Sequence, residues 1–302
     1  MQFLEFYKSL LPYLALIPVG IFIGRKHLIP KSWITRPLLF FLMPWLVINH
    51  FQEAESDSLL TLAAMGFSLA ILMLIPGGLL NKHVDNTYNP NLIRSSFSFY
   101  NVAFFGIPTV IAIFGEDSVT HLICIYIGTA LYGDLIGYFQ VARTNSTARE
   151  AFHKLLKVPF LYAFISAILF RVNEVEIPPM VKDLSEVFGV VVSATGMLIV
   201  GMNCEKVNFR KLDWSFIPKM LGTRLLSGVI LAGVFLLLEN TFVASLETEQ
   251  QQMFALLPLF PIAANITVFA SYLNANEEDS AIWILASMGL SLVLIPLAIG
   301  FF

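Results

Sequence analysis

The chain has 302 residues, of which 57% are hydrophobic and only 13% are charged, and its mean hydropathy is +0.76. Soluble globular domains usually carry about 25% charged residues, because ionised groups must cover their surface. The 18 basic and 21 acidic residues nearly balance, so nucleic acid is not an expected partner. The composition excludes a soluble domain and indicates an integral membrane protein in contact with a lipid bilayer.

Ten apolar segments, each bounded by charged or turn-forming residues, follow one another along the chain. They cover residues 4–24, 37–51, 58–80, 97–114, 119–141, 157–171, 184–202, 214–238, 253–273 and 280–302. A transmembrane helix needs about 20 largely apolar residues. The first, second and sixth segments have short apolar cores, so these must extend into flanking polar residues or tilt less. We predict an all-α polytopic protein with about ten transmembrane helices.

Basic residues gather in alternate loops between these segments. The basic loops carry Arg25, Lys26, Lys31 and Arg36, then Lys82 and Arg94, then Arg143, Arg149, Lys154 and Lys157, and finally Lys206, Arg210, Lys211 and Lys219. The other loops are mainly acidic. The loop 274–279 departs from the alternation, because it lies on the side of the basic loops but is acidic. Lys and Arg are retained in the cytoplasm. We therefore expect both termini on the non-cytoplasmic side.

The two halves of the sequence resemble each other. Residues 10–15 resemble residues 157–162, and Glu116-Asp117-Ser118 before the fifth segment matches Glu278-Asp279-Ser280 before the tenth. Each match alone could arise by chance in apolar sequence, but their shared order favours a repeat. An odd number of spans in each half makes the repeat inverted, a plan associated with secondary transporters. The predicted organisation is a first repeat over 1–142, a cytoplasmic linker over 143–158 and a second repeat over 159–302.

The fourth and ninth segments carry Pro and Asn in corresponding places. The fourth contains Asn101 and Pro108, and the ninth contains Pro261 and Asn265. Proline removes a backbone donor and interrupts a helix, and the freed groups must find partners inside the protein or in a water-lined cavity. Interrupted helices at matching places in two inverted halves indicate a transport site. We expect two broken helices that cross.

These segments resemble the auxin efflux carrier family of permeases. The resemblance rests on residues 101–108, which read Asn-Val-Ala-Phe-Phe-Gly-Ile-Pro, on residues 114–117, and on residues 261–270 followed by Ser287, Ser291 and Pro296. It is specific over about a fifth of the chain. The linker of only sixteen residues between the halves resembles that of the short, prokaryotic members, which implies a bacterial inner membrane.

The resemblance implies a fold, an activity and a site. Helices 1, 2, 6 and 7 would form a scaffold, and helices 3–5 and 8–10 a transport unit in which broken helices 4 and 9 cross. The protein would be a secondary transporter that moves a small carboxylate or auxin-like weak acid by an elevator-like or rocking movement. We assign the crossover and substrate site to Asn101, Gly106, Pro108, Pro261, Asn265 and Thr267. The two asparagines could instead only cap the half-helices.

Two ionisable residues lie deep within predicted spans. Asp134 in the fifth segment and Arg224 in the eighth lie on the order of 10–15 Å inside the cytoplasmic boundary. Such groups are costly and normally face a partner or a cavity. Three interpretations stay open: a structural Asp134–Arg224 ion pair, Arg224 extending to the interface, or proton coupling through Asp134 with Arg224 as its counter-charge.

The remaining polar residues predict no catalytic or cofactor chemistry. No His, Cys and acidic grouping has zinc spacing, no nucleotide-binding motif is visible, and no nucleophile is paired with a base. We therefore expect no enzyme activity, no cofactor and no nucleotide. His50 and His121 are predicted at outer span ends without an assigned role, and Asn203 also has none. The oligomeric state is open, with a homodimer as one option.

Two other functions compete with the carrier. A sodium-coupled organic-anion symporter of the bile-acid type would share the inverted plan. It would need carboxylates near the crossover, and segments four and nine contain none, but backbone carbonyls can also bind sodium, so this alternative stays open. A transporter-like receptor or sensor usually adds a soluble output domain, which this sequence lacks.

Overall fold

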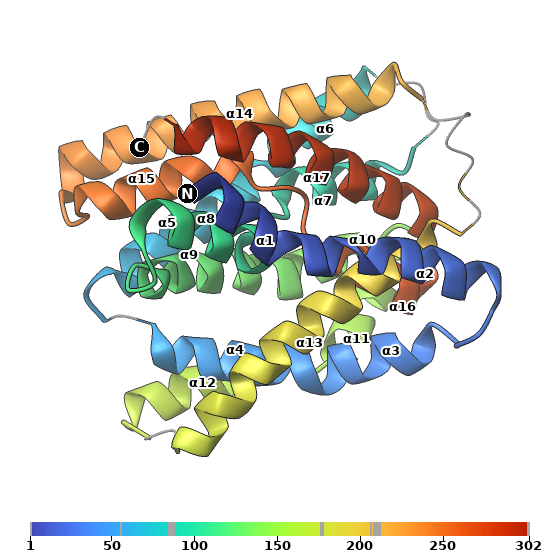
Figure 1. Cartoon of the computed structure of the whole chain (residues 1–302), viewed down its shortest axis with the longest axis horizontal. Helices are drawn as coiled ribbons and strands as arrows, with labels where there is room; N and C mark the ends of the chain where they lie inside the picture. The colour runs from blue at the N-terminus through green and yellow to red at the C-terminus, as the bar shows by residue number, and fades with distance from the viewer. Residues whose placement is uncertain are drawn as a thin grey trace.

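A computed structural model of the chain describes residues 2–54, 56–83, 88–175, 178–205, 207 and 213–300. These described residues form helices and turns without a strand (Figure 1). The first half contains α1 (Gln2–Leu14), α2 (Leu16–Arg25), α3 (Ser32–Pro37), η1 (Leu38–Leu42), α4 (Met43–Glu53), α5 (Ser56–Leu72), α6 (Leu74–Lys82), α7 (Pro90–Ser98), η2 (Val102–Gly106), α8 (Ile107–Phe114), α9 (Val119–Leu131), η3 (Tyr132–Gly137) and α10 (Tyr138–Ala142). The second half contains α11 (Ala148–Lys157), α12 (Phe160–Val172), α13 (Pro179–Asn203), α14 (Phe216–Leu238), η5 (Glu239–Val243), α15 (Thr248–Leu256), η6 (Leu257–Leu259), α16 (Asn265–Leu273) and α17 (Glu277–Ile299).

Seven helical stretches within the described residues are long and apolar enough to cross a membrane. They are Phe6–Arg25, Ser32–Glu53, Ser58–Lys82, Pro90–Phe114, Val119–Ala142, Phe216–Val243 and Glu277–Ala298. The helices α11 and α12 form an eighth candidate when counted together, with a bend of 51° between them. The prediction of an all-α membrane protein is confirmed at this level, as seven or eight candidate spans.

The two remaining predicted segments take other forms. The seventh lies in α13, of which Val187–Asn203 is a shorter apolar stretch. The ninth is divided, because residues 260–264 between η6 and α16 are not helical. Lys206, Arg210 and Lys211 of the last predicted basic loop, and residues 301–302 at the end of the tenth segment, lie outside the described residues.

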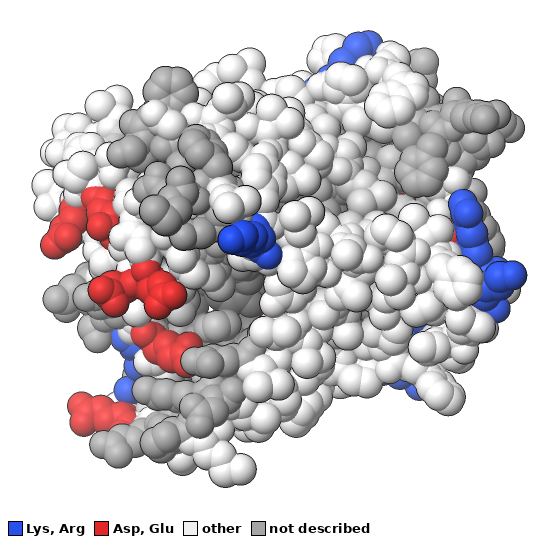
Figure 2. All heavy atoms as spheres, viewed as in Figure 1, with Lys and Arg blue, Asp and Glu red and all other residues white. Residues whose placement is uncertain are grey.

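The surface agrees with a membrane environment. Large apolar side chains are exposed along several helices, including Leu60 at 81% and Leu226 at 63%. Figure 2 shows a broad face that is almost free of charge, with acidic side chains gathered at its left end and mainly Lys and Arg at its right end. In the same view, α1 begins and α17 ends at the left, whereas the chain passes from α2 to α3 at the right (Figure 1). We call the right end the basic end and the left end the acidic end.

Two helix pairs approach each other closely at glycines. A Cβ atom on Gly20 of α2 would fall against the carbonyl oxygen of Leu198 in α13 and 3.0 Å from the Cα of Gly201. A Cβ atom on Gly128 of α9 would fall against the carbonyl oxygen of Ala63 in α5. Small residues at such contacts let the backbones of membrane helices pack directly. They therefore fix α2 on α13 and α5 on α9.

We expect Gly128→Ala to lower the stability of the folded protein by about 1–3 kcal/mol, because an inserted methyl group must push α5 and α9 apart. The matched control is Gly233→Ala in α14, where a Cβ atom meets nothing within 4 Å. The measurement is the apparent melting temperature of both purified variants in detergent. Equal melting temperatures for Gly128→Ala and the wild type would show that the α5–α9 contact accommodates the methyl group without loss of stability.

Candidate functional site

The first break in the helices lies at Phe99–Asn101. The helix α7 ends at Ser98, and the next helical segment, η2, begins at Val102. Asn101 caps η2, since its Oδ1 accepts a hydrogen bond from the Phe104 amide at 3.2 Å. An Asn side chain that binds nearby backbone competes with the helix and favours a helix start. Pro108 lies in the first turn of α8, where a missing donor costs little.

The second break lies at residues 260–264. The 3₁₀ segment η6 contains Pro258 and ends at Leu259, and α16 begins at Asn265. Two serines of α17 satisfy backbone groups that the break leaves free. The Ile262 amide donates to Ser287 Oγ at 3.0 Å, and Ser291 Oγ donates to the Leu259 carbonyl at 2.7 Å. The predicted interruptions of the fourth and ninth segments are therefore both confirmed.

The two breaks are in direct contact. The Asn101 amide donates a backbone hydrogen bond of 2.9 Å to the carbonyl of Pro261. A Cβ atom on Gly106 would lie 3.0 Å from Cε2 of Phe260, so the absence of a side chain at Gly106 lets the second break approach. Asn101 and Gly106 thus contact the second break at Pro261 and Phe260, which are 160 and 154 residues away in sequence.

Arg224 of α14 holds both breaks. Its Nε donates to the Ser96 carbonyl at 3.0 Å, and its Nη2 donates to the Phe99 carbonyl at 2.9 Å, both in the first break region. Its Nη1 donates to the Phe260 carbonyl of the second break at 3.1 Å. The guanidinium carbon also lies 4.6 Å from the centre of the Tyr100 ring, within the range of a cation–π contact. Arg224 is only 4% exposed, so one buried cation joins two chain interruptions.

The predicted Asp134–Arg224 ion pair is absent. Both residues are described, and no ion pair within 4.0 Å joins them. The interpretation in which Arg224 extends to the interface is also wrong, because the guanidinium is buried against backbone carbonyls. The physical reason is that each break leaves backbone carbonyl groups without donors. A guanidinium has five N–H donors in a fixed plane, so it can satisfy several of these carbonyls at once, whereas a single carboxylate would occupy only part of its donors.

Asp134 occupies a separate buried place. It lies in the π-helical segment η3 and is 2% exposed. Its Oδ1 has no hydrogen-bond partner among the described residues. A π-helical turn inside an α-helix often marks a functional position. Asp134 therefore stays a candidate for proton coupling, without Arg224 as a contacting counter-charge.

Three polar groups at or beside the crossover have unused hydrogen-bonding capacity. Asn101 Nδ2 and Tyr100 Oη are both buried and have no hydrogen-bond partner within the described part of the chain. Asn265 is half-buried at the start of α16, and its side chain forms no hydrogen bond with the described residues. Buried polar groups are nearly always satisfied in folded proteins. Asn101 Nδ2 and Tyr100 Oη are therefore the buried groups beside the crossover that have hydrogen-bonding capacity left over.

Thr267 belongs to a different cluster from Asn101. Its hydroxyl accepts a hydrogen bond of 2.7 Å from Asn203 Nδ2 and one of 3.0 Å from Ser280 Oγ. This cluster joins α13, α16 and α17 and is buried. It gives Asn203 a packing role that its sequence context did not reveal. The structure does not bring Thr267 to the crossover contact.

The two histidines at outer span ends lie beside acidic residues. His50 Nδ1 is 3.3 Å from Glu53 Oε2, and His121 Nδ1 is 3.8 Å from Glu249 Oε1, which places α9 next to α15.

Tyr100 is the residue that the sequence analysis missed at the crossover. Its position directly before Asn101, inside the break, is the signal that could have identified it.

The sequence was compared with protein-family models and with curated proteins, and neither comparison gives a match.

Proposed function

We propose that the chain is a secondary transporter that moves a small organic anion, a carboxylate or auxin-like weak acid, through the crossover. The observation that carries this proposal is the contact of the two breaks around Arg224, beside the side-chain amide Nδ2 of Asn101, which has no partner among the described residues. Broken helices with free donors and a buried cation form a polar site at mid-span, where a transporter binds its substrate.

The proposed architecture is ten spans in two inverted five-helix repeats, with boundaries at 1–142, 143–158 and 159–302. The packing of the scaffold helices supports it. Span 1 packs on span 7 through Gly20 and Gly201, and span 2 packs on span 6, where Gln52 Nε2 donates to the Ala167 carbonyl at 2.9 Å. The proposed inverted repeat would relate these two contacts by a pseudo-two-fold axis that exchanges spans 1 with 6 and 2 with 7.

The proposed orientation places the basic end in the cytoplasm and both termini outside, in a bacterial inner membrane. The separation of charge in Figure 2 supports this orientation. At the basic end, Lys31 Nζ lies 2.6 Å from Glu277 Oε2, which ties the proposed scaffold to the start of α17 in the proposed transport unit. Movement of the transport unit would have to break this contact.

The chemistry of the crossover suits an anion. Arg224 has a full positive charge and contacts carbonyls and a ring, with no acidic partner among the described residues. Buried charges are normally paired, so a bound carboxylate would supply the missing negative charge. The amide Nδ2 of Asn101 can add a donor without a further buried charge. A sodium ion would instead need a cage of oxygen ligands.

The test is the replacement of each crossover asparagine by alanine. We expect Asn101→Ala and Asn265→Ala each to weaken anion binding by about 1–3 kcal/mol, the cost of leaving a buried polar group of the ligand unpaired. A panel of labelled small carboxylates is first screened by counterflow in proteoliposomes with the wild type. The dissociation constant of the best carboxylate is then measured calorimetrically in detergent for each variant.

The matched control is Asn173→Ala, which removes an exposed amide at the end of α12. It should bind the carboxylate as the wild type does. Unchanged affinity in both crossover variants would place the substrate elsewhere. A fall in the melting temperature of Asn101→Ala without a loss of affinity would reduce Asn101 to a helix cap.

A further inference from the structure

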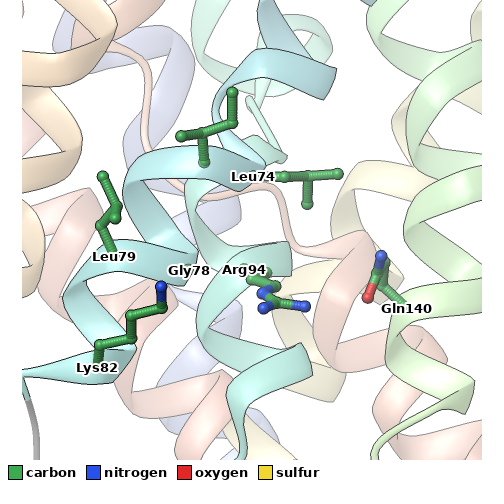
Figure 3. A pocket seen from close by; sticks show the side chains of 7 residues that line it. Leu74, Gly78, Leu79, Lys82, Arg94 and Gln140 are labelled. Carbon is green, nitrogen blue, oxygen red and sulfur yellow. The ribbon is translucent and has the colours of Figure 1, made fainter.

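A second polar site lies away from the crossover, between α6, α7 and α10. It is a cavity of about 270 Å³ lined by Leu74, Ile75, Gly78, Leu79, Lys82, Arg94 and Gln140. Figure 3 shows the Lys82 side chain rising along α6 toward Gly78, and the Arg94 guanidinium extending from α7 toward Gln140. Two cations and an amide from three helices therefore surround one cavity.

Both cations lack an acidic partner. Among the described residues, Lys82 and Arg94 take part in no ion pair within 4.0 Å, and no acidic side chain lines the cavity. The side chain of Arg94 also forms no hydrogen bond with the described residues, although it is half-buried. A guanidinium with five free donors beside an ammonium group is suited to bind the oxygens of a phosphate.

The cavity is held in shape by contacts that do not use its cations. Asn89 Nδ2 and Asn91 Nδ2 donate to the carbonyls of Thr144 and Arg143 at 2.9 and 3.0 Å, which ties the start of α7 to the end of α10. A Cβ atom on Gly78 would lie 3.2 Å from Nε of Arg94. The guanidinium therefore lies directly over the bare backbone of α6, on a framework that is already formed.

The surroundings favour a lipid as the source of the phosphate. Ile75 is 59% exposed and Leu79 is 51% exposed, and both line the cavity. These side chains offer an apolar surface for acyl chains along α6, next to the cations at the basic end. Basic pockets between transmembrane helices on the cytoplasmic side bind anionic lipid headgroups. A free phosphate would gain nothing from the apolar wall.

We propose that Lys82, Arg94 and Gln140 form a binding site for the phosphodiester of an anionic phospholipid, with the acyl chains lying against Ile75 and Leu79. The site is separate from the crossover, and it does not depend on which substrate the protein carries or on whether it carries one. Two features determine the class of ligand. The two cations attract the negative charge of a phosphodiester, and the adjacent exposed apolar side chains contact acyl chains.

The test is native mass spectrometry of the purified full chain in neutral detergent with added phosphatidylglycerol. The same experiment is repeated with zwitterionic phosphatidylcholine and with soluble glycerol 3-phosphate, which separates a lipid from a free phosphate. We expect the wild type to bind phosphatidylglycerol more tightly than it binds phosphatidylcholine or glycerol 3-phosphate. We also expect the double variant Lys82→Gln, Arg94→Gln to lose roughly tenfold or more in apparent affinity, since its charge-assisted hydrogen bonds are gone.

The matched control is the double variant Lys26→Gln, Lys219→Gln, which removes two exposed cations outside the cavity and should retain phosphatidylglycerol as the wild type does. Lys82→Gln alone changes only an exposed side chain, so it tests the site even if the Arg94 substitution lowers stability. Equal binding of phosphatidylglycerol by the wild type and by the Lys82 variants would overturn the proposal. Preferential binding of glycerol 3-phosphate would also overturn it, in favour of a soluble phosphate.

Discussion

Replacing Arg224 with methionine is expected to destabilise the protein more than any other single substitution at the crossover. The change would leave three buried carbonyls without donors, those of Ser96, Phe99 and Phe260. Each unpaired buried acceptor costs about 1–3 kcal/mol. We expect a total loss on the order of 3–5 kcal/mol, because water that enters the gap recovers part of the sum of these costs.

The matched control is Arg171→Met. Arg171 also donates to two backbone carbonyls, those of Phe51 and Ala54, but at a half-buried position near the acidic end where water can replace it. We expect its loss to cost no more than about 1.5 kcal/mol. The measurement is the apparent melting temperature in detergent together with the fraction of monodisperse protein. A wild-type melting temperature for Arg224→Met would show that the breaks persist without the guanidinium.

A second pair of variants separates the charge of Arg224 from its hydrogen bonds. Lysine keeps the positive charge but cannot reach three carbonyls with a fixed planar group, whereas glutamine keeps a donor and loses the charge. If the charge attracts the carboxylate, Arg224→Lys should bind it more tightly than Arg224→Gln does, at similar melting temperatures. The reverse order of affinities would assign Arg224 a purely structural role.

The sequence predicted the breaks because their causes are local. Asn101 caps the helical segment that follows the first break, and Pro258 and Pro261 lie at the second, so side-chain chemistry that is visible in the sequence accounts for where each helix stops. Although the fourth span begins at Pro90, seven residues before the predicted segment, the positions of the spans followed in the same way from apolar length, apart from α13 and the bent pair α11–α12. There the apolar stretch is shorter than a full span, and composition alone does not determine how the chain completes it.

The partner of Arg224 could not be predicted, because it is backbone. Sequence patterns show charged side chains, and they suggested Asp134 as the nearest opposite charge at similar depth. The carbonyls of Phe99 and Phe260 become acceptors only when both helices are broken and brought together. The same limit explains why the partner of Thr267 was not predicted. Its hydroxyl accepts a hydrogen bond from Asn203, which lies 64 residues earlier in the sequence, and is not directed at the crossover.

Asp134→Asn is expected to abolish any dependence of transport on a pH gradient, if the proposed carrier is coupled to protons. Asp134 is a buried carboxyl that has no ion pair among the described residues and an Oδ1 without a partner. An ionised carboxylate is costly in such surroundings. A conformational change that exposes η3 to water on one side of the membrane would therefore change the fraction of Asp134 that is protonated. Asparagine has the same shape but cannot take up or release a proton.

The melting temperature separates this role from a structural one. Because no ion pair joins Asp134 to Arg224, the neutral variant leaves no cation newly unpaired, and we expect it to melt at or above the wild-type temperature. Uptake of the carboxylate identified by counterflow is measured in proteoliposomes with an imposed pH gradient at fixed membrane potential. Asp117→Asn, which changes an exposed carboxylate in the loop before α9, is the matched control. If Asp134→Asn transports with the pH dependence of the wild type, the coupling group is not Asp134, and its burial in the π-helical turn serves packing alone.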